Sequence, residues 1–193
     1  LVEGLRYCYH TRLIRTMLLM AAVPTIVAMP YFQLLPSYAR DVLHVGPSGL
    51  GLLFTAMGAG ALTGNFALAA TPRLRHRGTI LLVAGTLFGL MLCILALVRS
   101  VPLALFALAL AGASNGVYMA LNSTIIQEAT PDELRGRVMS VYMFTWGLMP
   151  VGALPAGAIA EFHGAPTSIF IGGLLAGLFA LWLLCFQPQL RKV

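Results

Sequence analysis

The chain of 193 residues is 59% hydrophobic and only 9% charged. An ordinary soluble domain is about half apolar and about a quarter charged. A soluble core of this length could not bury that much apolar surface, so lipid must surround most of the chain. The net charge of +6 does not indicate nucleic-acid binding, because the basic residues occupy short turns between apolar runs.

The three cysteines, Cys8, Cys93 and Cys185, are scattered without CxxC spacing. That pattern argues against a disulfide framework or a zinc site, and we expect neither a metal nor a cofactor. The sequence starts at Leu1 without an initiator Met. We therefore expect it to be part of a longer protein.

Residues 1–15 mix three arginines with apolar side chains, which predicts a cytoplasmic interfacial segment along the membrane surface. The uncharged run Thr16–Ala39 follows and is long enough to cross a hydrocarbon core of about 30 Å. Prolines that would break a soluble helix can kink a span packed among neighbours. This run contains three of them, Pro24, Pro30 and Pro36.

Five further apolar runs predict five more spans, each separated from the next by a turn that carries charge or proline. In the second span, Ala56, Gly60 and Gly64 have small-xxx-small spacing, which favours close helix packing. The expected bounds are Gly46–Ala70, Thr79–Val98, Val101–Gln127, Val138–Ala160 and Thr167–Phe186.

Lys and Arg are distributed unevenly between the two sides of the membrane. Six spans put both termini on one side, and only Arg40 and Arg99 lie on the other. The positive-inside rule therefore predicts cytoplasmic termini. The side of the termini carries Arg6, Arg12, Arg15, Arg73, Arg75, Arg77, Arg135, Arg137, Arg191 and Lys192.

The spans form two triplets of matching character. Spans one and four carry polar residues at depth, spans two and five are rich in glycine, and spans three and six are almost purely apolar. A triplet has an odd number of spans, so the second copy must be inverted. We predict an all-α membrane protein whose six transmembrane helices form two inverted three-helix repeats, residues 16–98 and 99–193.

Polar side chains on spans one and four predict a substrate cavity between the two spans. We hypothesise that two helical faces line this cavity, with Phe32, Phe144 and Trp146 nearby. The alternative is that the polar groups cross-link helices inside the bundle, worth about 0.6 kcal/mol each. The two faces are Thr25, Met29 and Gln33, and Asn115, Tyr118 and Asn122.

The charged stretch Thr130–Ser140 reads as a turn between the fourth and fifth spans. Its sequence from Pro131, Pro-Asp-Glu-Leu-Arg-Gly-Arg-Val-Met-Ser, resembles the loop between helices ten and eleven of major facilitator superfamily transporters. Gly152, Pro155 and Gly157 in the fifth span are also similar. The whole chain resembles the C-terminal half, helices seven to twelve, in the bacterial branch of the enterobactin exporter and macrolide-efflux permeases.

The resemblance implies a proton-coupled antiporter of the bacterial inner membrane that exports small amphipathic molecules, siderophores or drugs, by alternating access. Its partners would be membrane lipid and an N-terminal six-helix half. The acidic residues of this chain lie at or beyond span ends, so we expect the coupling carboxylate in the other half. The family pattern implies a cytoplasmic gate formed by Arg73, Arg77, Asp132, Glu133, Arg135 and Arg137, although the family's usual Asp is missing near Arg73.

Two other functions are considered. A non-transporting six-helix module would need no second half. An intramembrane serine protease is suggested by residues 112–116, Gly-Ala-Ser-Asn-Gly, which match G-x-S-x-G around Ser114. A serine nucleophile needs a general base at matching depth, and every histidine lies outside the predicted spans. We therefore expect a protein that is not an enzyme.

Overall fold

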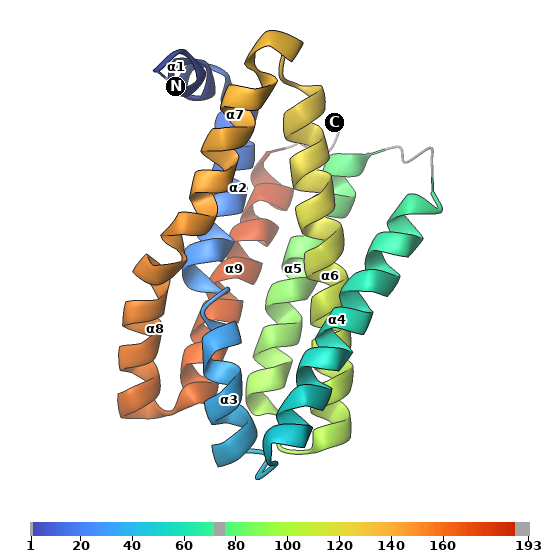
Figure 1. Ribbon diagram of the computed structural model, residues 1–193, viewed down its shortest axis with the longest axis vertical. Coiled ribbons are helices and arrows are strands. Elements are labelled where there is room, and N and C mark those ends of the chain that lie inside the picture. The colour runs from blue at the N-terminus through green and yellow to red at the C-terminus, as the bar shows by residue number, and fades with distance from the viewer. Residues whose placement is uncertain (1, 72–75, 188–193) are drawn as a thin grey trace.

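The computed structural model describes residues 2–71 and 76–187 of the chain. These residues contain six helical segments long and apolar enough to cross a membrane, and the described ranges hold no strand (Figure 1). The predicted all-α membrane fold is confirmed. The elements are α1 Val2–His10, α2 Arg12–Val27, α3 Tyr31–Asp41, α4 Pro47–Ala69, α5 Arg77–Leu97, α6 Val101–Glu128, α7 Asp132–Phe144, the 3₁₀ helix η1 Thr145–Leu148, α8 Met149–His163 and α9 Ala165–Phe186.

The first span is two helices, α2 and α3, separated at Ala28–Pro30. The peptide N–H groups of Ala28 and Met29 both donate to the carbonyl of Pro24. Pro30 has no N–H group, so the carbonyl of Ile26 lacks its usual helical donor. The expectation of one continuous face through residues 25–33 is therefore wrong, because backbone hydrogen bonding is interrupted inside that face.

The charged stretch is helical and not a turn, which corrects the predicted start of the fifth span at Val138. The chain turns only at residues 129–131, and α7 begins directly after Pro131. Asp132 and Glu133 occupy the first turn of α7. Carboxylates there complement the partial positive charge of a helix N-terminus, so the charges extend the helix beyond the apolar run.

α1 lies across one end of the bundle, against α2 and α7 (Figure 1). The Tyr7 hydroxyl donates to the carbonyl of Ala129 at 3.3 Å, and the Cys8 side chain is buried. A short break separates α1 from α2, which begins at Arg12. The first membrane helix thus starts inside the segment 1–15 that was predicted to lie on the surface.

Several contacts between helices have a counterpart when the two repeats are exchanged, although α8 packs on α9 whereas α4 has little contact with α5. The second span packs on the fourth (α4 on α6), and the fifth span packs on the first (η1 and α8 on α2). Likewise the third span packs on the fourth (α5 on α6), and the sixth packs on the first (α9 on α2 and α3). The two apolar spans, α5 and α9, pack extensively on each other. Such exchangeable contacts are typical of two copies of one three-helix unit.

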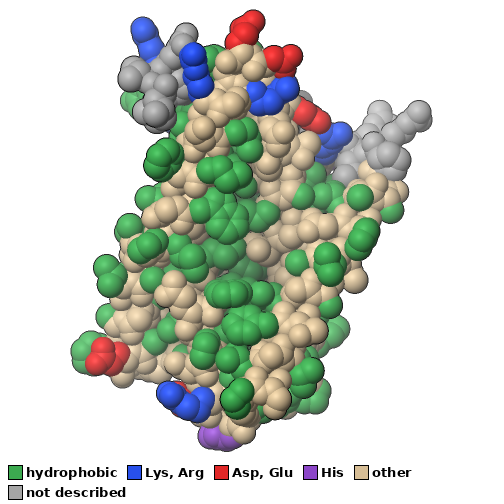
Figure 2. Space-filling model, viewed as in Figure 1, with side chains coloured by type: hydrophobic (Ala, Val, Ile, Leu, Met, Phe, Trp, Pro, Cys, Tyr) green, Lys and Arg blue, Asp and Glu red, His purple; other side chains and the backbone are tan. Residues whose placement is uncertain are grey.

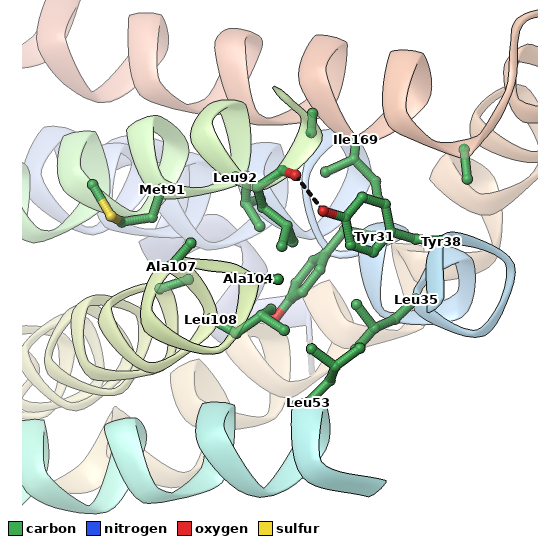
Figure 3. Packing of buried hydrophobic residues seen from close by; sticks show 14 of the residues in the cluster. Tyr31, Leu35, Tyr38, Leu53, Met91, Leu92, Ala104, Ala107, Leu108 and Ile169 are labelled. Atoms are coloured by element: carbon green, nitrogen blue, oxygen red, sulfur yellow. Dashed lines mark hydrogen bonds between the residues drawn. The ribbon is translucent and has the colours of Figure 1, made fainter. Parts of the chain in front are cut away.

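Buried apolar side chains form two clusters, one toward each end of the bundle. In the cluster that Figure 3 shows, Tyr38 of α3 is fully buried between α5, α6 and α9. Its hydroxyl oxygen lies 2.7 Å from the carbonyl oxygens of both Leu95 and Val98, which share its one proton. These carbonyls lie at the C-terminal end of α5, where helical donors run out, so Tyr38 caps α5.

The predicted close packing of the second span is confirmed at Gly60 and Gly64. A Cβ atom at Gly60 would lie 1.9 Å from the carbonyl oxygen of Ala109, and one at Gly64 would lie 2.6 Å from that of Ala113. Only glycine therefore permits α4 and α6 to approach this closely.

Two spans have little cover within the chain. In the most apolar part of α5, 50% of the residues are buried. The corresponding share is only 11% in α4 and 11% in the α7–α8 span. Both spans border the face shown in Figure 2, where apolar side chains run down the middle and charged ones gather at the ends. This face, formed by α2, α3, α4, α6, α7 and α8, is called the open face below.

Candidate substrate cavity

Tyr118 and Asn122, two of the predicted cavity residues, are buried where α6 packs on α2. The Tyr118 hydroxyl donates to the carbonyl of Met20. That carbonyl is free because Pro24, four residues later, has no N–H to donate. The Asn122 amide nitrogen donates to the carbonyl of Met17 at 3.3 Å, and its Oδ1 has no partner among the described residues. Both side chains therefore fasten α6 to α2.

The remaining cavity residues differ in their environment. The Thr25 hydroxyl is buried and donates to the carbonyl of Ala21 in its own helix at 2.8 Å. Met29 is half-buried within the break between α2 and α3, and Gln33 on α3 is exposed. Asn115 on α6 is half-buried. The polar groups left available to a ligand are thus mainly those of Gln33 and Asn115.

Aromatic side chains are prominent on the helices of the open face. Phe32 on α3 is 43% exposed, and its ring centroid lies 4.9 Å from that of Phe54 on α4. Phe144 at the end of α7 and Trp146 in η1 are also exposed. These rings offer stacking and apolar contact but no charge.

A hollow of about 520 Å³ lies along α7. Volumes of this size are ordinary for drug-sized ligands. Two methionines contribute unbranched, polarisable side chains that adapt to varied shapes. The lining residues are Gly136, Met139, Ser140, Met143, Phe144 and Gly147.

Charged residues at the end of the bundle near α1 join three helices. Arg77, the first residue of α5, contacts both carboxylate oxygens of Glu128, the last residue of α6, at 2.6 and 2.7 Å. Arg135 on α7 pairs with Asp132 at 2.6 Å and donates to the carbonyl of Gln127 at 3.1 Å. These contacts connect α5, α6 and α7 at one level.

The other predicted gate residues are Arg73, Glu133 and Arg137. Glu133 and Arg137 are exposed on α7, and Arg73 lies outside the described residues. Sequence reasoning did not identify Glu128 as the partner of Arg77. The sequence contained a signal for this pair, because neighbouring antiparallel helices bring the start of one helix, here Arg77, close to the end of the other, here Glu128. In the described ranges, no group of three or more His, Cys, Asp or Glu side chains is placed to hold a metal.

Comparison with known proteins identifies relatives among transporters. Over 198 aligned residues, the chain is 29% identical to the multidrug efflux pump Tap of Mycolicibacterium fortuitum, covering 100% of this chain and 47% of Tap. It is 26% identical to Tap of Mycobacterium tuberculosis H37Rv, with 100% and 46% covered. It is 22% identical to the uncharacterized MFS-type transporter YfmI of Bacillus subtilis, with 100% and 49% covered.

The chain thus spans about half the length of the curated relatives it matches. All of residues 1–193 match the family described as Transmembrane secretion effector, MFS_3. Together with the six candidate spans, this makes the chain a multi-pass membrane protein. The chain belongs to the transmembrane secretion effector family of major facilitator proteins.

Proposed function

We propose that this chain is the C-terminal half of an exporter of small amphipathic molecules, working by alternating access against an N-terminal six-helix half. The observation that carries the proposal is the open face. Two of its spans, α4 and α7–α8, have few buried residues, although both are long enough to cross the membrane. A second half docked on this face would supply the missing contacts and enclose a cavity near the bilayer midplane.

The side chains of the open face favour uncharged or weakly polar substrates. Phe32, Phe54 and Trp146 contribute aromatic surface, while Gln33 contributes an exposed amide. The methionines of the α7 hollow suit a surface that accepts ligands of different shape. The multidrug relatives favour drug-like substrates over siderophores.

The break between α2 and α3 supports alternating access. Discontinuous helices at the midplane are a recurring feature of transporters that rock around a central site. α2 also contacts η1, a 3₁₀ segment that interrupts the fifth span. An irregular segment of the fifth span therefore packs on the helix that ends at the break, where small changes in backbone angle can reorient the helix halves.

We place the termini, α1 and the Arg77–Glu128 pair on the cytoplasmic side of a bacterial inner membrane. The distribution of Lys and Arg in the sequence supports this orientation. The ion pairs of Arg77 and Arg135 hold the ends of α5, α6 and α7 together as part of a cytoplasmic gate. Proton coupling is assigned to the other half, because Glu128 is already paired with Arg77.

The test is an efflux assay of the full-length protein in a bacterium that lacks its own pumps. Accumulation of ethidium and of the neutral dye Nile red is measured with and without a protonophore. We expect lower accumulation of Nile red, reversed when the protonophore collapses the proton gradient, and a smaller effect on the cation ethidium. Expression of residues 1–193 alone should leave accumulation unchanged.

Matched tryptophan variants make the assay specific for the open face. Trp146 in η1 and Trp182 on α9 are similarly exposed, at 48% and 52%, but α9 lies behind α2 and α8 in Figure 1. We expect Trp146→Ala to reduce efflux severalfold and Trp182→Ala to leave it intact. Equal effects of the two changes would contradict a cavity on the open face. Efflux by residues 1–193 alone would refute the half-transporter proposal.

A further inference from the structure

A lateral cleft of about 370 Å³ lies outside the open face, between α4 and α5. Both helices pack on α6 but diverge from each other toward the end of the bundle that carries the Arg77–Glu128 pair (Figure 1). α6 forms the floor of the resulting wedge. The lining residues are Gly64, Ala67, Leu68, Thr71, Ile80, Val83, Ala84, Leu87, Ala113, Ser114 and Val117.

Ser114 is the polar group on the floor of this cleft, and its side chain is 5% exposed. Its hydroxyl has no hydrogen-bond partner among the described residues. The other buried Ser and Thr hydroxyls there all donate to a backbone carbonyl: Thr16 to Arg12, Thr25 to Ala21, Thr130 to Ile126, Thr145 to Tyr142 and Ser168 to Ala156. Ser114 therefore offers a donor at the surface of the cleft. The other hydroxyl in the lining, that of Thr71, already donates to the carbonyl of Ala67 at 3.0 Å.

The depth of Ser114 limits what can occupy the cleft. Glu128 ends α6, and the 14 residues between the two positions correspond to about 21 Å along the helix. Since the hydrocarbon core is about 30 Å thick, Ser114 lies well inside it. The ester groups of a phospholipid stay at the interface and cannot reach this hydroxyl. Its acyl chain can, but contains no hydrogen-bond acceptor.

We infer that the α4–α5 cleft is a binding site for compact, uncharged apolar molecules that carry one hydrogen-bond acceptor, with Ser114 as the donor. Such molecules dissolve in hydrocarbon and can enter from the lipid side. The cleft volume falls in the lower part of the range for small-molecule sites. The site is separate from the proposed transport cavity and does not depend on it, because binding can be measured without transport.

Benzophenone is a suitable probe, because it has two apolar rings, one carbonyl acceptor and photochemistry that labels nearby C–H bonds. The full-length protein in phosphatidylcholine vesicles is irradiated with benzophenone, and adducts are mapped by mass spectrometry. We expect adducts concentrated in the α4, α5 and α6 segments that line the cleft. Diphenylmethane, which has the same rings without the carbonyl, should compete about fivefold less well, the equivalent of one neutral hydrogen bond.

Two pairs of variants test the shape and the donor separately. Ala67→Phe fills the cleft from an exposed position of α4, and Ala69→Phe adds the same ring on the other side of that helix. Ser114→Ala removes the free donor, and Ser168→Ala removes an equally buried hydroxyl that already has an acceptor. We expect Ala67→Phe and Ser114→Ala to reduce cleft labelling severalfold, and the two controls to leave it unchanged.

Three results would overturn the inference. The first is labelling spread evenly over the lipid-facing helices, and the second is cleft labelling that survives Ala67→Phe. The third is labelling that Ala67→Phe abolishes but Ser114→Ala leaves intact. In that case a diazirine-labelled acyl chain of phosphatidylcholine should mark the same residues, and the occupant would be a lipid chain held by shape alone.

Discussion

In both repeats, glycines of the middle span pack against backbone carbonyls of the other repeat, but the helix that they contact is regular in one case and broken in the other. In the α4–α6 pair, Gly60 and Gly64 lie against the carbonyls of Ala109 and Ala113, so a regular helix is contacted along successive turns. In the α8–α2 pair, Gly152 lies against the carbonyl of Ile26, where a Cβ would be 1.8 Å from the oxygen. The Ile26 carbonyl has no helical donor because Pro30, four residues later, lacks an N–H group. It lies directly at the break of the first span.

The difference separates a rigid part of the bundle from a jointed one. α6 keeps an unbroken backbone from Val101 to Glu128, and α4 rests on it at several points. α2 ends at Val27, and the facing span is itself interrupted by η1. Gly172 of α9 adds a second contact at the break, against the carbonyl of Val27. We therefore expect α4–α6 to move as one unit and α2–α3 to bend.

The largest effect is expected at the rigid contact. Gly60→Ala places a methyl group onto a backbone carbonyl that cannot yield, so α4 must shift away from α6. Overpacking of this kind costs about 1–3 kcal/mol, and we expect a fall in apparent melting temperature of about 5 °C or more in detergent. Gly58→Ala is the control, because nothing lies within 4 Å of a Cβ there. A similar fall in both variants would contradict a rigid contact.

The equivalent change at the joint should be milder. Gly152→Ala meets the carbonyl of Ile26, but α2 and η1 on either side can adjust. We expect about half the loss of melting temperature seen for Gly60→Ala. The matched control in the same helix is Gly157→Ala, which has open space around it. A loss equal to that of Gly60→Ala would show that the joint is as stiff as the α4–α6 pair.

Closing the break should separate stability from function. Pro30→Ala supplies an N–H group that can donate to the carbonyl of Ile26 and make the first span continuous. We expect an increase in unfolding free energy of about 1 kcal/mol, measured as a higher melting temperature. Dye efflux by the full-length protein should decrease at the same time. Unchanged efflux with a closed break would remove the hinge from the proposed mechanism.

The ion pair between Arg77 and Glu128 should contribute little to stability. Both side chains are partly exposed, and pairs of this kind are worth about 0–1 kcal/mol. A double-mutant cycle with Arg77→Gln and Glu128→Gln should give a coupling energy below about 1 kcal/mol, smaller at high salt. A larger coupling, insensitive to salt, would make this pair a structural part of the rigid side.

The smallest effect concerns α1, which rests on the jointed side. Burial raises the pKa of the Cys8 thiol. A raised pKa leaves less thiolate at neutral pH, so alkylation by maleimide should be slow and should accelerate at higher pH than for a free cysteine. Tyr7→Phe removes the bond to Ala129 and should speed alkylation severalfold, whereas Tyr9→Phe changes an exposed ring and should not. Because Cys185 is exposed, alkylation is followed at Cys8 itself by peptide mapping, and fast alkylation there would mean that α1 is not docked.

Span positions were predictable from sequence because they follow from continuous apolar length. The second, third, fourth and sixth spans begin and end within two residues of expectation. The first and fifth could not be placed as well. Hydropathy contains no information on the missing N–H group of Pro30, which breaks the first span. It also does not predict that Asp132 and Glu133 extend the helix of the fifth span beyond its apolar part.

The candidate site was less predictable, because the same polar residue can face a cavity or a helix. Tyr118 and Asn122 share a helical face with Asn115, yet both side chains donate hydrogen bonds to backbone carbonyls of α2. The deciding fact is that Pro24 frees the carbonyl of Met20, which requires knowing which helix lies opposite. Their role in substrate binding stays a prediction.

The tyrosine bonds described above also constrain how the chain enters the membrane. Tyr38 is joined to Leu95, 57 residues later, and Met20 to Tyr118, 98 residues later. At a synthesis rate of about 5–20 residues per second, the Tyr38 hydroxyl waits roughly 3–11 s before its acceptor is made. During that interval the Tyr38 phenol and the free carbonyl of Met20 lack the partners that they have in the folded bundle. Biogenesis of this bundle is therefore expected to need a holding site for the first span until the third and fourth spans arrive.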